Sequence, residues 1–171
     1  MNSIKALLCS TVLISAGLWN IAANALPSDR TQPIHIQSDQ AHSDQNRGLT
    51  TYSGSVQMDQ GSLKILADKV IISSLDNQVS KIVAIGKPAQ YQQQPSPESE
   101  MVTATGQRIV YLVEQETLTL IDNASLNQNG TVMTGKHIDY DIKQSVVKAS
   151  KDTDSIDSER IHIVIPAKPE R

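Results

Sequence analysis

Apolar and polar residues alternate along much of the chain after residue 32. Ile34-His35-Ile36-Gln37 shows this pattern, and residues 55–59, 117–120 and 138–142 repeat it. Because successive side chains of a strand point to opposite faces, such a segment buries one set of residues and leaves the other in water. No stretch of similar length in this region has the spacing of a helix. The pattern therefore predicts an all-β protein.

Short segments rich in turn-forming residues separate these runs. Asn129-Gly130 is the clearest, because both positions of an Asn-Gly pair tolerate a positive φ and join hairpin strands. Residues 92–99, with Pro95 and Pro97, predict a longer mobile loop. Many short strands joined by turns are typical of a sandwich, barrel or jelly roll. The other predicted turns are Asn46-Arg47-Gly48, Gln60-Gly61, Asp76-Asn77 and Gly86-Lys87-Pro88.

The phase of the alternation assigns one set of apolar residues to the interior. These residues are Ile34, Ile36, Val56, Met58, Leu63, Ile65, Tyr111, Val113, Leu118, Leu120, Leu126, Ile138, Tyr140, Ile161 and Ile163. They either fill a closed core, as in most proteins with alternating strands, or line an apolar groove. Phe is absent from the chain, and a core of Val, Ile and Leu leaves more room for a ligand. The composition therefore favours the groove.

The N-terminus has the pattern of a secretory signal peptide. Lys5 is followed by an apolar stretch from Ala6 to Ala23, and Ala23-Asn24-Ala25 supplies the small residues of a cleavage site after Ala25. A membrane anchor is the rival interpretation, but a helix that spans the bilayer needs about 20 apolar residues. Cys9, the single cysteine, lies in this stretch. The mature protein is therefore expected in the periplasm, without disulfides or cysteine ligands.

The part of the chain that follows the signal has about the length of one domain. The sequence predicts a signal peptide at residues 1–25, a flexible N-terminal segment at 26–32, a β domain at 33–166 and a flexible C-terminal tail at 167–171. The formal net charge is −3, and the Lys and Arg residues are scattered among acidic ones. A nucleic-acid partner is therefore not expected.

The polar residues show no pattern typical of a catalytic or metal site. His35 and His162 alternate with isoleucines and are expected to point away from the apolar face, with no third metal ligand nearby. Asp139 and Asp141 flank Tyr140, but general acid–base catalysis needs partly buried carboxylates, and these are expected to face water. Ser, His and Asp all occur, but no Gly-x-Ser-x-Gly elbow or Gly-rich phosphate loop is present. We therefore expect no enzymatic activity, cofactor or metal, and no activity driven by nucleotide hydrolysis.

A series of short segments extends over nearly all of the predicted mature chain: residues 32–40, Gly54-Ser55-Val56 with Gln60-Gly61, Ala67-Asp68-Lys69-Val70, Gly86-Lys87-Pro88-Ala89, Asn123-Ala124, Gly135 and residues 160–166. Together these segments resemble the OstA-like family of periplasmic lipopolysaccharide-transport proteins. No single segment is specific, but their order and spacing together carry the resemblance. The second half departs from the first in having Lys136 where the first has Asp68.

The resemblance implies an antiparallel β-jelly roll, open or slightly twisted, with an apolar interior. It implies a carrier that binds lipopolysaccharide and shields the acyl chains of lipid A between the inner and outer membranes. Inner-membrane and outer-membrane transport components would be its partners. The groove residues would be Ile34, Ile36, Val56, Met58, Leu63, Ile65, Tyr91, Tyr111, Val113, Leu118, Leu120, Leu126, Ile138 and Tyr140. Without Phe, Tyr91 and Tyr111 are the large candidates among them.

The first and last predicted strands can serve as sheet edges. They are expected to expose the backbone of Ile34, His35, Ile36, Ile161, His162, Ile163 and Ile165. A free edge offers unpaired N–H and C=O groups to another chain, and strand addition between copies gives a head-to-tail assembly that does not close. The alternative is that both strands pair inside one monomer. For the whole protein, the alternatives to a lipid carrier are a structural or interaction β-module of the cell envelope without a lipid ligand and, less favoured, a small periplasmic hydrolase.

Overall fold

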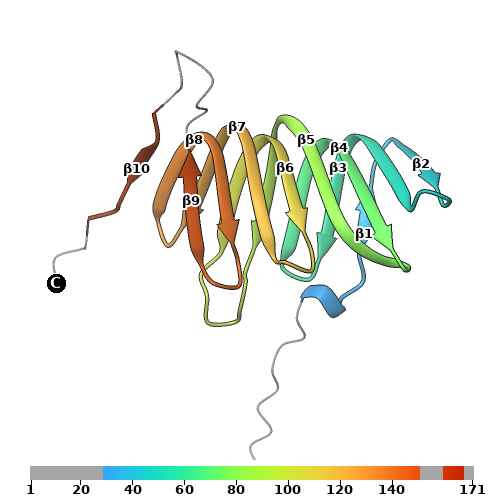
Figure 1. Ribbon diagram of the computed structural model, residues 1–171, viewed down its shortest axis with the longest axis horizontal. Coiled ribbons are helices and arrows are strands. Elements are labelled where there is room, and N and C mark those ends of the chain that lie inside the picture. The colour runs from blue at the N-terminus through green and yellow to red at the C-terminus, as the bar shows by residue number, and fades with distance from the viewer. Residues whose placement is uncertain (1–28, 151–159, 168–171) are drawn as a thin grey trace, which may run out of the picture.

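The computed structural model describes residues 29–150 and 160–167, and the strands within them form one antiparallel sheet (Figure 1). The predicted signal peptide, with Cys9 and the cleavage site at Ala25, lies outside the described residues, as do residues 168–171 of the predicted tail. The described part of the chain contains no helix that is long and apolar enough to cross a membrane.

A 3-10 helix precedes ten strands. The elements are η1 (Asp29–Thr31), β1 (His35–Gln37), β2 (Gln40–Asp44), β3 (Leu49–Gln60), β4 (Leu63–Leu75), β5 (Gln78–Gln93), β6 (Val102–Leu112), β7 (Thr117–Gln128), β8 (Thr131–Asp141), β9 (Val146–Ser150) and β10 (His162–Val164). From β3 to β8 each strand pairs with the next one in the sequence. Two short strands, β1 and β2, pair with β3 at one edge, and β9 and β10 pair with β8 at the other.

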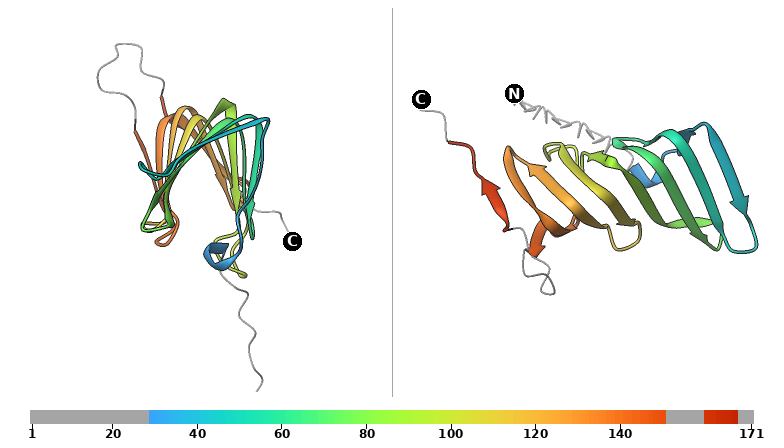
Figure 2. Two further views of the ribbon diagram at one scale, coloured as in Figure 1. Left: turned by 90° about the vertical axis from the view of Figure 1, so that its right-hand side faces the viewer. Right: turned by 90° about the horizontal axis from the view of Figure 1, so that it is seen from above.

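The sheet is folded along a crease that crosses the long strands. The register shifts at neighbouring points of these strands, between Ser53 and Val56 on β3, for example, and between Ile121 and Ala124 on β7. Such bulges bend a strand and increase its local twist. In the end view of Figure 2 the strands therefore rise on one side, bend at the crease and descend on the other side. The side that lies opposite the crease is open. The predicted all-β, antiparallel, open jelly roll is confirmed.

The crease divides the sheet into two arms. Arm A consists of β2, residues 49–53, 69–75, 78–85, 108–112, 117–121 and 137–141, and β9. Arm B consists of β1, residues 56–60, 63–66, 89–93, 102–105, 124–128 and 131–135, and β10. Backbone conformations that only some residues adopt make the bend possible. At Gly54, φ is 84° and a Cβ would overlap the carboxylate of Asp39, so no other residue fits there without strain.

Four of the five predicted turns join consecutive strands. Asn129-Gly130 connects β7 to β8 with φ values of 53° and 76°, as the Asn-Gly pair predicts. The prediction for Gly86-Lys87-Pro88 was wrong, because these residues lie inside β5, at the register shift between Ile85 and Ala89. Proline has no N–H for the ladder, so a proline within a strand marks an interruption, and here the interruption is the crease. The long loop begins after Gln93 because β5 extends further than expected.

The inner faces of the two arms form the hydrophobic core. Eleven of the residues predicted to face the interior or to line the groove are buried, and Ile34, Ile36 and Val113 are half-buried and pack against them. The prediction was wrong for Ile161 and Ile163, which are 38% and 53% exposed. The eleven buried residues are Val56, Met58, Leu63, Ile65, Tyr91, Tyr111, Leu118, Leu120, Leu126, Ile138 and Tyr140.

Candidate functional site

The inner apolar residues form rows that run across the strands. In a paired sheet, directly opposed residues place their side chains on the same face. One row, here called row B, lies on arm B and reaches from β1 to β10. It consists of Ile36, Met58, Ile65, Tyr91, Ala104, Leu126, Met133 and Ile163. No polar residue interrupts it, so arm B carries a continuous apolar strip from one edge of the sheet to the other.

Arm A carries a comparable row, here called row A. It consists of Tyr52, Val70, Ala84, Ile109, Leu120, Ile138 and Ala149, and it reaches from β3 to β9. The two rows line the inside of the folded sheet and follow its long direction. The predicted groove residues therefore share one interior surface, and the crease brings the two halves of that surface face to face.

Tyrosines bring the two arms into contact. The rings of Tyr91 on arm B and Tyr111 on arm A meet edge to face, with their centroids 6.0 Å apart and an interplanar angle of 63°. On β7, Gln128 donates a hydrogen bond from Nε2 to the hydroxyl of Tyr140 on arm A over 3.2 Å. The hydroxyl of Tyr91 donates to Oε1 of Gln93. At these points the interior is filled with side chains and is not an empty trough.

A cavity of about 420 Å³ lies at the open side, between the free ends of the two arms. Tyr111 and Ile142 line it from the side of arm A, and Gln93 and the loop residues Pro95 and Pro97 line it from arm B. Sites for small ligands commonly have volumes of about 300 to 1,000 Å³. This cavity is therefore large enough to accept part of a ligand beside the packed interior.

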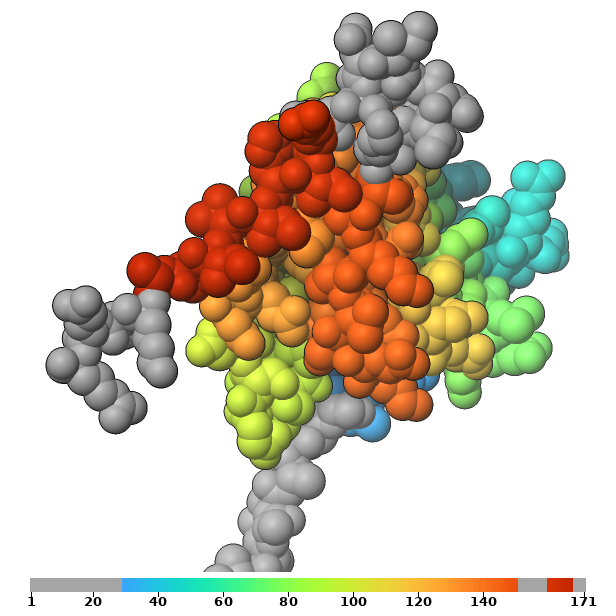
Figure 3. Space-filling view, turned by 60° about the vertical axis from the view of Figure 1, so that its left-hand side comes forward, coloured from blue at the N-terminus to red at the C-terminus, as the bar shows by residue number. Residues whose placement is uncertain are grey.

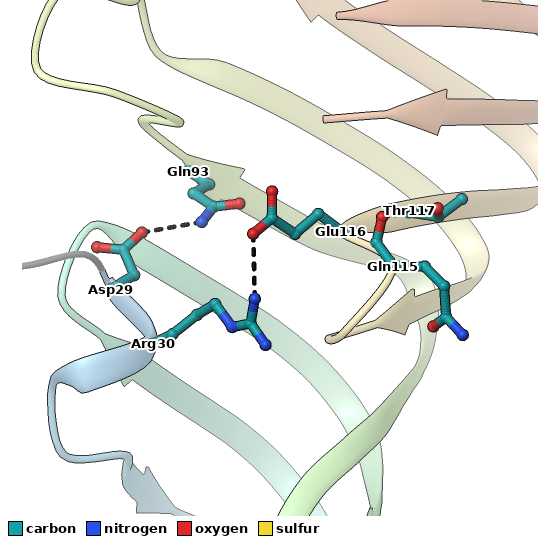
Figure 4. A network of polar contacts seen from close by, with 6 residues as sticks. All are labelled: Asp29, Arg30, Gln93, Gln115, Glu116 and Thr117. Carbon is teal, nitrogen blue, oxygen red and sulfur yellow. Dashed lines mark hydrogen bonds and ion pairs between the residues drawn. The ribbon is translucent and has the colours of Figure 1, made fainter. Parts of the chain in front are cut away.

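Polar side chains of η1 and of both arms line the cavity, and Figure 4 shows the contacts that join them. Asp29 accepts hydrogen bonds from Ser62 and Gln93 at the end of arm B. Arg30 forms an ion pair with Glu116, in the turn after β6, over 3.2 Å. The sequence analysis missed these residues. Arg30 and Glu116 are 86 residues apart, and no local pattern predicts their contact.

The environment of the tyrosine hydroxyl groups disfavours their ionisation. Burial raises the pKa of Tyr111 to about 12, and the negative charge of Glu116 acts in the same direction, while Arg30 lowers the pKa. Burial also raises the pKa of Tyr91 well above its usual value and that of Tyr140 to a smaller extent. In each case the neutral phenol is the form that the folded protein stabilises.

We expect the free energy of unfolding to fall between pH 10 and pH 12. Below pH 10 Tyr111 is neutral in both states, whereas between pH 10 and 12 it loses its proton only in the unfolded chain, which favours unfolding. Two pKa units correspond to about 2 to 3 kcal/mol. Urea unfolding across this range checks the effect, and Tyr111→Phe should lose less stability than the wild type. Parallel pH profiles of the two proteins would contradict the assignment.

The other chemical candidates have structural roles on the outside of arm A. Asp139 accepts a hydrogen bond from Oγ1 of Thr119 over 2.7 Å and lies 3.1 Å from Nε2 of His137. Asp141 accepts one from the backbone N–H of Gln144. Residues 29–150 and 160–167 contain no group of three or more His, Cys, Asp or Glu side chains arranged to hold a metal ion.

The residues predicted to form partner edges lie at the two ends of the sheet. Ile34, His35 and Ile36 belong to β1 or precede it, and β1 pairs with β3 alone among the described strands. β10 pairs with β8 in the same way, and Figure 3 shows it at the surface of that end. Val164 and Ile165, with exposed fractions of 63% and 75%, add apolar surface there. Each of these two strands thus has one side without a partner among the described strands.

Comparisons with known proteins agree with this geometry. The family described as "LptA/(LptD N-terminal domain) LPS transport protein" matches residues 35–146. The lipopolysaccharide export system protein LptH of Pseudomonas aeruginosa is 36% identical over 160 residues, which are 92% of this chain and 91% of LptH. LptA of Escherichia coli K12 is 32% identical over 152 residues, or 88% of this chain and 80% of LptA. None of these names describes an enzyme.

A solved structure has the same fold. The crystal structure of LptH from Pseudomonas aeruginosa, described as the LptA-homologous periplasmic component of the lipopolysaccharide transport device, superposes with a TM-score of 0.75. The match is 38% identical and covers 82% of this chain and 100% of that one. This chain therefore belongs to the family of LptA/(LptD N-terminal domain) LPS transport proteins.

Proposed function

We propose that this protein carries lipopolysaccharide through the periplasm and covers its acyl chains with the inner surface of the folded sheet. The observation that carries the proposal is row B, an apolar strip that continues from Ile36 on one edge to Ile163 on the other. The names of the relatives, which are lipopolysaccharide export proteins, support it. The periplasmic description of LptH and the signal-peptide pattern before residue 26 support the location.

The physical requirement for such a carrier is a continuous apolar surface. Each buried methylene contributes about 0.8 kcal/mol, so exposing several long acyl chains to water costs on the order of tens of kcal/mol. A carrier must therefore replace the membrane along the whole path of the lipid. Rows that run across the strands meet this requirement, because they extend along the sheet and end at its edges.

The two edges support end-to-end assembly as part of the proposal. β10 exposes backbone and apolar side chains at one end of row B, and β1 ends the same row at the other. Strand addition between β10 of one copy and β1 of the next would join their apolar strips. Inner-membrane and outer-membrane transport components would occupy the edges at the two ends of such a chain.

A photo-crosslinking amino acid in the interior tests lipid binding. We expect p-benzoylphenylalanine at Ile36 or Tyr111 to form adducts with lipopolysaccharide in cells, because both positions face the inside. The matched control is Leu75, which is 68% exposed and should give no adduct. Mass analysis of the adducts and of lipid that copurifies with the wild type identifies the ligand.

The contact between Tyr91 and Tyr111 favours a second candidate function, a β-module of the cell envelope with a closed core. In that case the arms stay together and no lipid reaches the interior. The same experiment separates the two candidates. Absence of lipopolysaccharide adducts from every inward position, with the protein folded, would favour the module and contradict the carrier.

A further inference from the structure

The 3-10 helix η1 lies at the open side of the jelly roll, and its side chains contact both arms. In Figure 4, Asp29 points toward Gln93 on arm B, while Arg30 extends to Glu116 in the turn that ends arm A. The end view in Figure 2 shows the same helix below the open side of the folded sheet. A segment that precedes the first strand therefore links the free ends of the two arms, in addition to the contact between Tyr91 and Tyr111 in the interior.

The attachment of η1 to arm B involves many contacts. The Asp29 carboxylate accepts hydrogen bonds from the backbone N–H and the hydroxyl of Ser62, over 2.6 and 2.7 Å, and from Gln93 Nε2 over 2.9 Å. Gln60 donates from Nε2 to the backbone oxygen of Gln32 over 2.9 Å. At Gly61, φ is 61° and a Cβ would collide with Asp29. Glycine at this turn lets Asp29 approach closely.

The attachment of η1 to arm A is weaker than its attachment to arm B. It runs through the ion pair of Arg30 and Glu116, whose side chains are 44% and 31% exposed. Partly exposed pairs contribute little to stability, and dissolved salt screens them. The helix η1 (Asp29–Thr31), here called the strap, is therefore bound to arm B by several hydrogen bonds and to arm A by an ion pair that dissociates more easily.

The strap forms part of the wall of the cavity at the open side. Asp29, Arg30 and Glu116 are among the residues that line this cavity, together with Tyr111 and Ile142 from the interior of arm A. A hydrogen-bonded path leads inward from Asp29 through Gln93 to Tyr91, which belongs to row B. A ligand that enters from the side thus meets the strap first and the tyrosine contact behind it.

We propose that this cavity is the lateral entrance for an acyl chain and that the Arg30–Glu116 ion pair keeps it closed in the free protein. The inference rests on the proposed function, because it takes a lipid with acyl chains as the ligand. Binding then requires the strap to leave Glu116, and the fraction of molecules with an open strap limits how fast lipid enters. Weakening the ion pair should therefore speed loading.

The test measures how quickly lipopolysaccharide reaches the groove. Purified protein with p-benzoylphenylalanine at Ile36, which does not line the cavity, is mixed with lipopolysaccharide and illuminated after increasing delays. We expect Glu116→Gln and Arg30→Gln to raise the rate of adduct formation about 1.5- to 5-fold. The double variant with Arg30→Glu and Glu116→Arg, which restores a pair of opposite sign, should return to the rate of the wild type.

The matched control is Asp44→Asn, which removes a comparable ion pair to Arg47 within a single turn of arm A. Its rate should equal that of the wild type. Raising the salt concentration to about 1 M should reduce the difference between wild type and Glu116→Gln, because salt screens the pair. Thermal unfolding followed by circular dichroism confirms that each variant is folded.

The outcomes separate the two claims. If the wild type and all variants form adducts at the same rate, or if Glu116→Gln and Arg30→Gln are slower, the entrance is refuted while the carrier function stands. If no protein forms an adduct with lipopolysaccharide at any inward position, the carrier function itself fails. Faster loading in both single variants, with rescue in the double variant, supports the entrance.

Discussion

Replacing Leu120 with Ala lowers the free energy of unfolding by about 3 to 5 kcal/mol, the range typical of a Leu→Ala change in a packed core. Leu120 is completely buried, and in row A it lies between Ile109 and Ile138. The loss has two sources, the apolar surface that is no longer buried and the cavity left between the arms. Urea unfolding of the purified protein without lipid measures it.

The size of this loss also reports how closely the arms pack. In a groove that stands open, Leu120 would face water or empty space, and its truncation would cost little. Contact between the arms, as seen at Tyr91 and Tyr111, predicts the large value. Leu75→Ala is the control, because Leu75 is 68% exposed and its change should stay within about 0.5 kcal/mol. A loss below about 1 kcal/mol for Leu120→Ala would contradict a filled interior in the free protein.

The sequence predicts which side chains of a strand are buried where apolar and polar residues alternate. It does not predict this where apolar residues occupy both faces of the strand. Leu118 and Leu120 alternate with threonines, so the direction of their side chains follows from the pattern, and both are fully buried. Along residues 70–72 and 82–85 the apolar residues are consecutive. The pattern of these residues does not indicate which face of the strand is buried. Val70, Ile72, Ile82 and Ala84 are in the core and were missed for this reason.

The wrong prediction for Ile163 shows that the direction of a side chain does not by itself determine whether the side chain is buried. Its alternation is correct, since it pairs with Met133 and continues row B on the inner face. Burial also requires an opposing surface, and β10 is the last described strand at its edge of the sheet. A single strand's pattern reports which way a side chain points, but the position of the strand in the sheet decides whether another element covers it.

The crease and the contacts of the strap depend on interactions between residues that are far apart in the sequence. Gly86-Lys87-Pro88 suits a turn as well as an interruption within a strand, and only the pairing of β5 with its neighbours distinguishes the two. The contact between Arg30 and Glu116 joins residues from an N-terminal helix and a distant hairpin turn. Charges of this kind are common on any surface, so the sequence offers no reason to pair these two.

The exposed end of row B has a direct consequence for assembly. If copies join through strand addition, Ile163 of one copy lies next to the β1 end of row B in the next, so its side chain is covered only in the assembly. A monomer should therefore tolerate a polar residue at this position, whereas a joint between copies should not.

Replacing Ile163 with Asp should raise the dissociation constant for self-association on the order of 100-fold, as expected when a charge is placed at the centre of an apolar contact. Sedimentation analysis over a range of concentrations measures it. The unfolding free energy of the monomer should change by less than about 1 kcal/mol, because the side chain is 53% exposed. His162→Asp is the matched control, since His162 is exposed and its side chain alternates to the opposite face of β10. Assembly that survives Ile163→Asp, or that is lost only together with the fold, would contradict end-to-end joining through this edge.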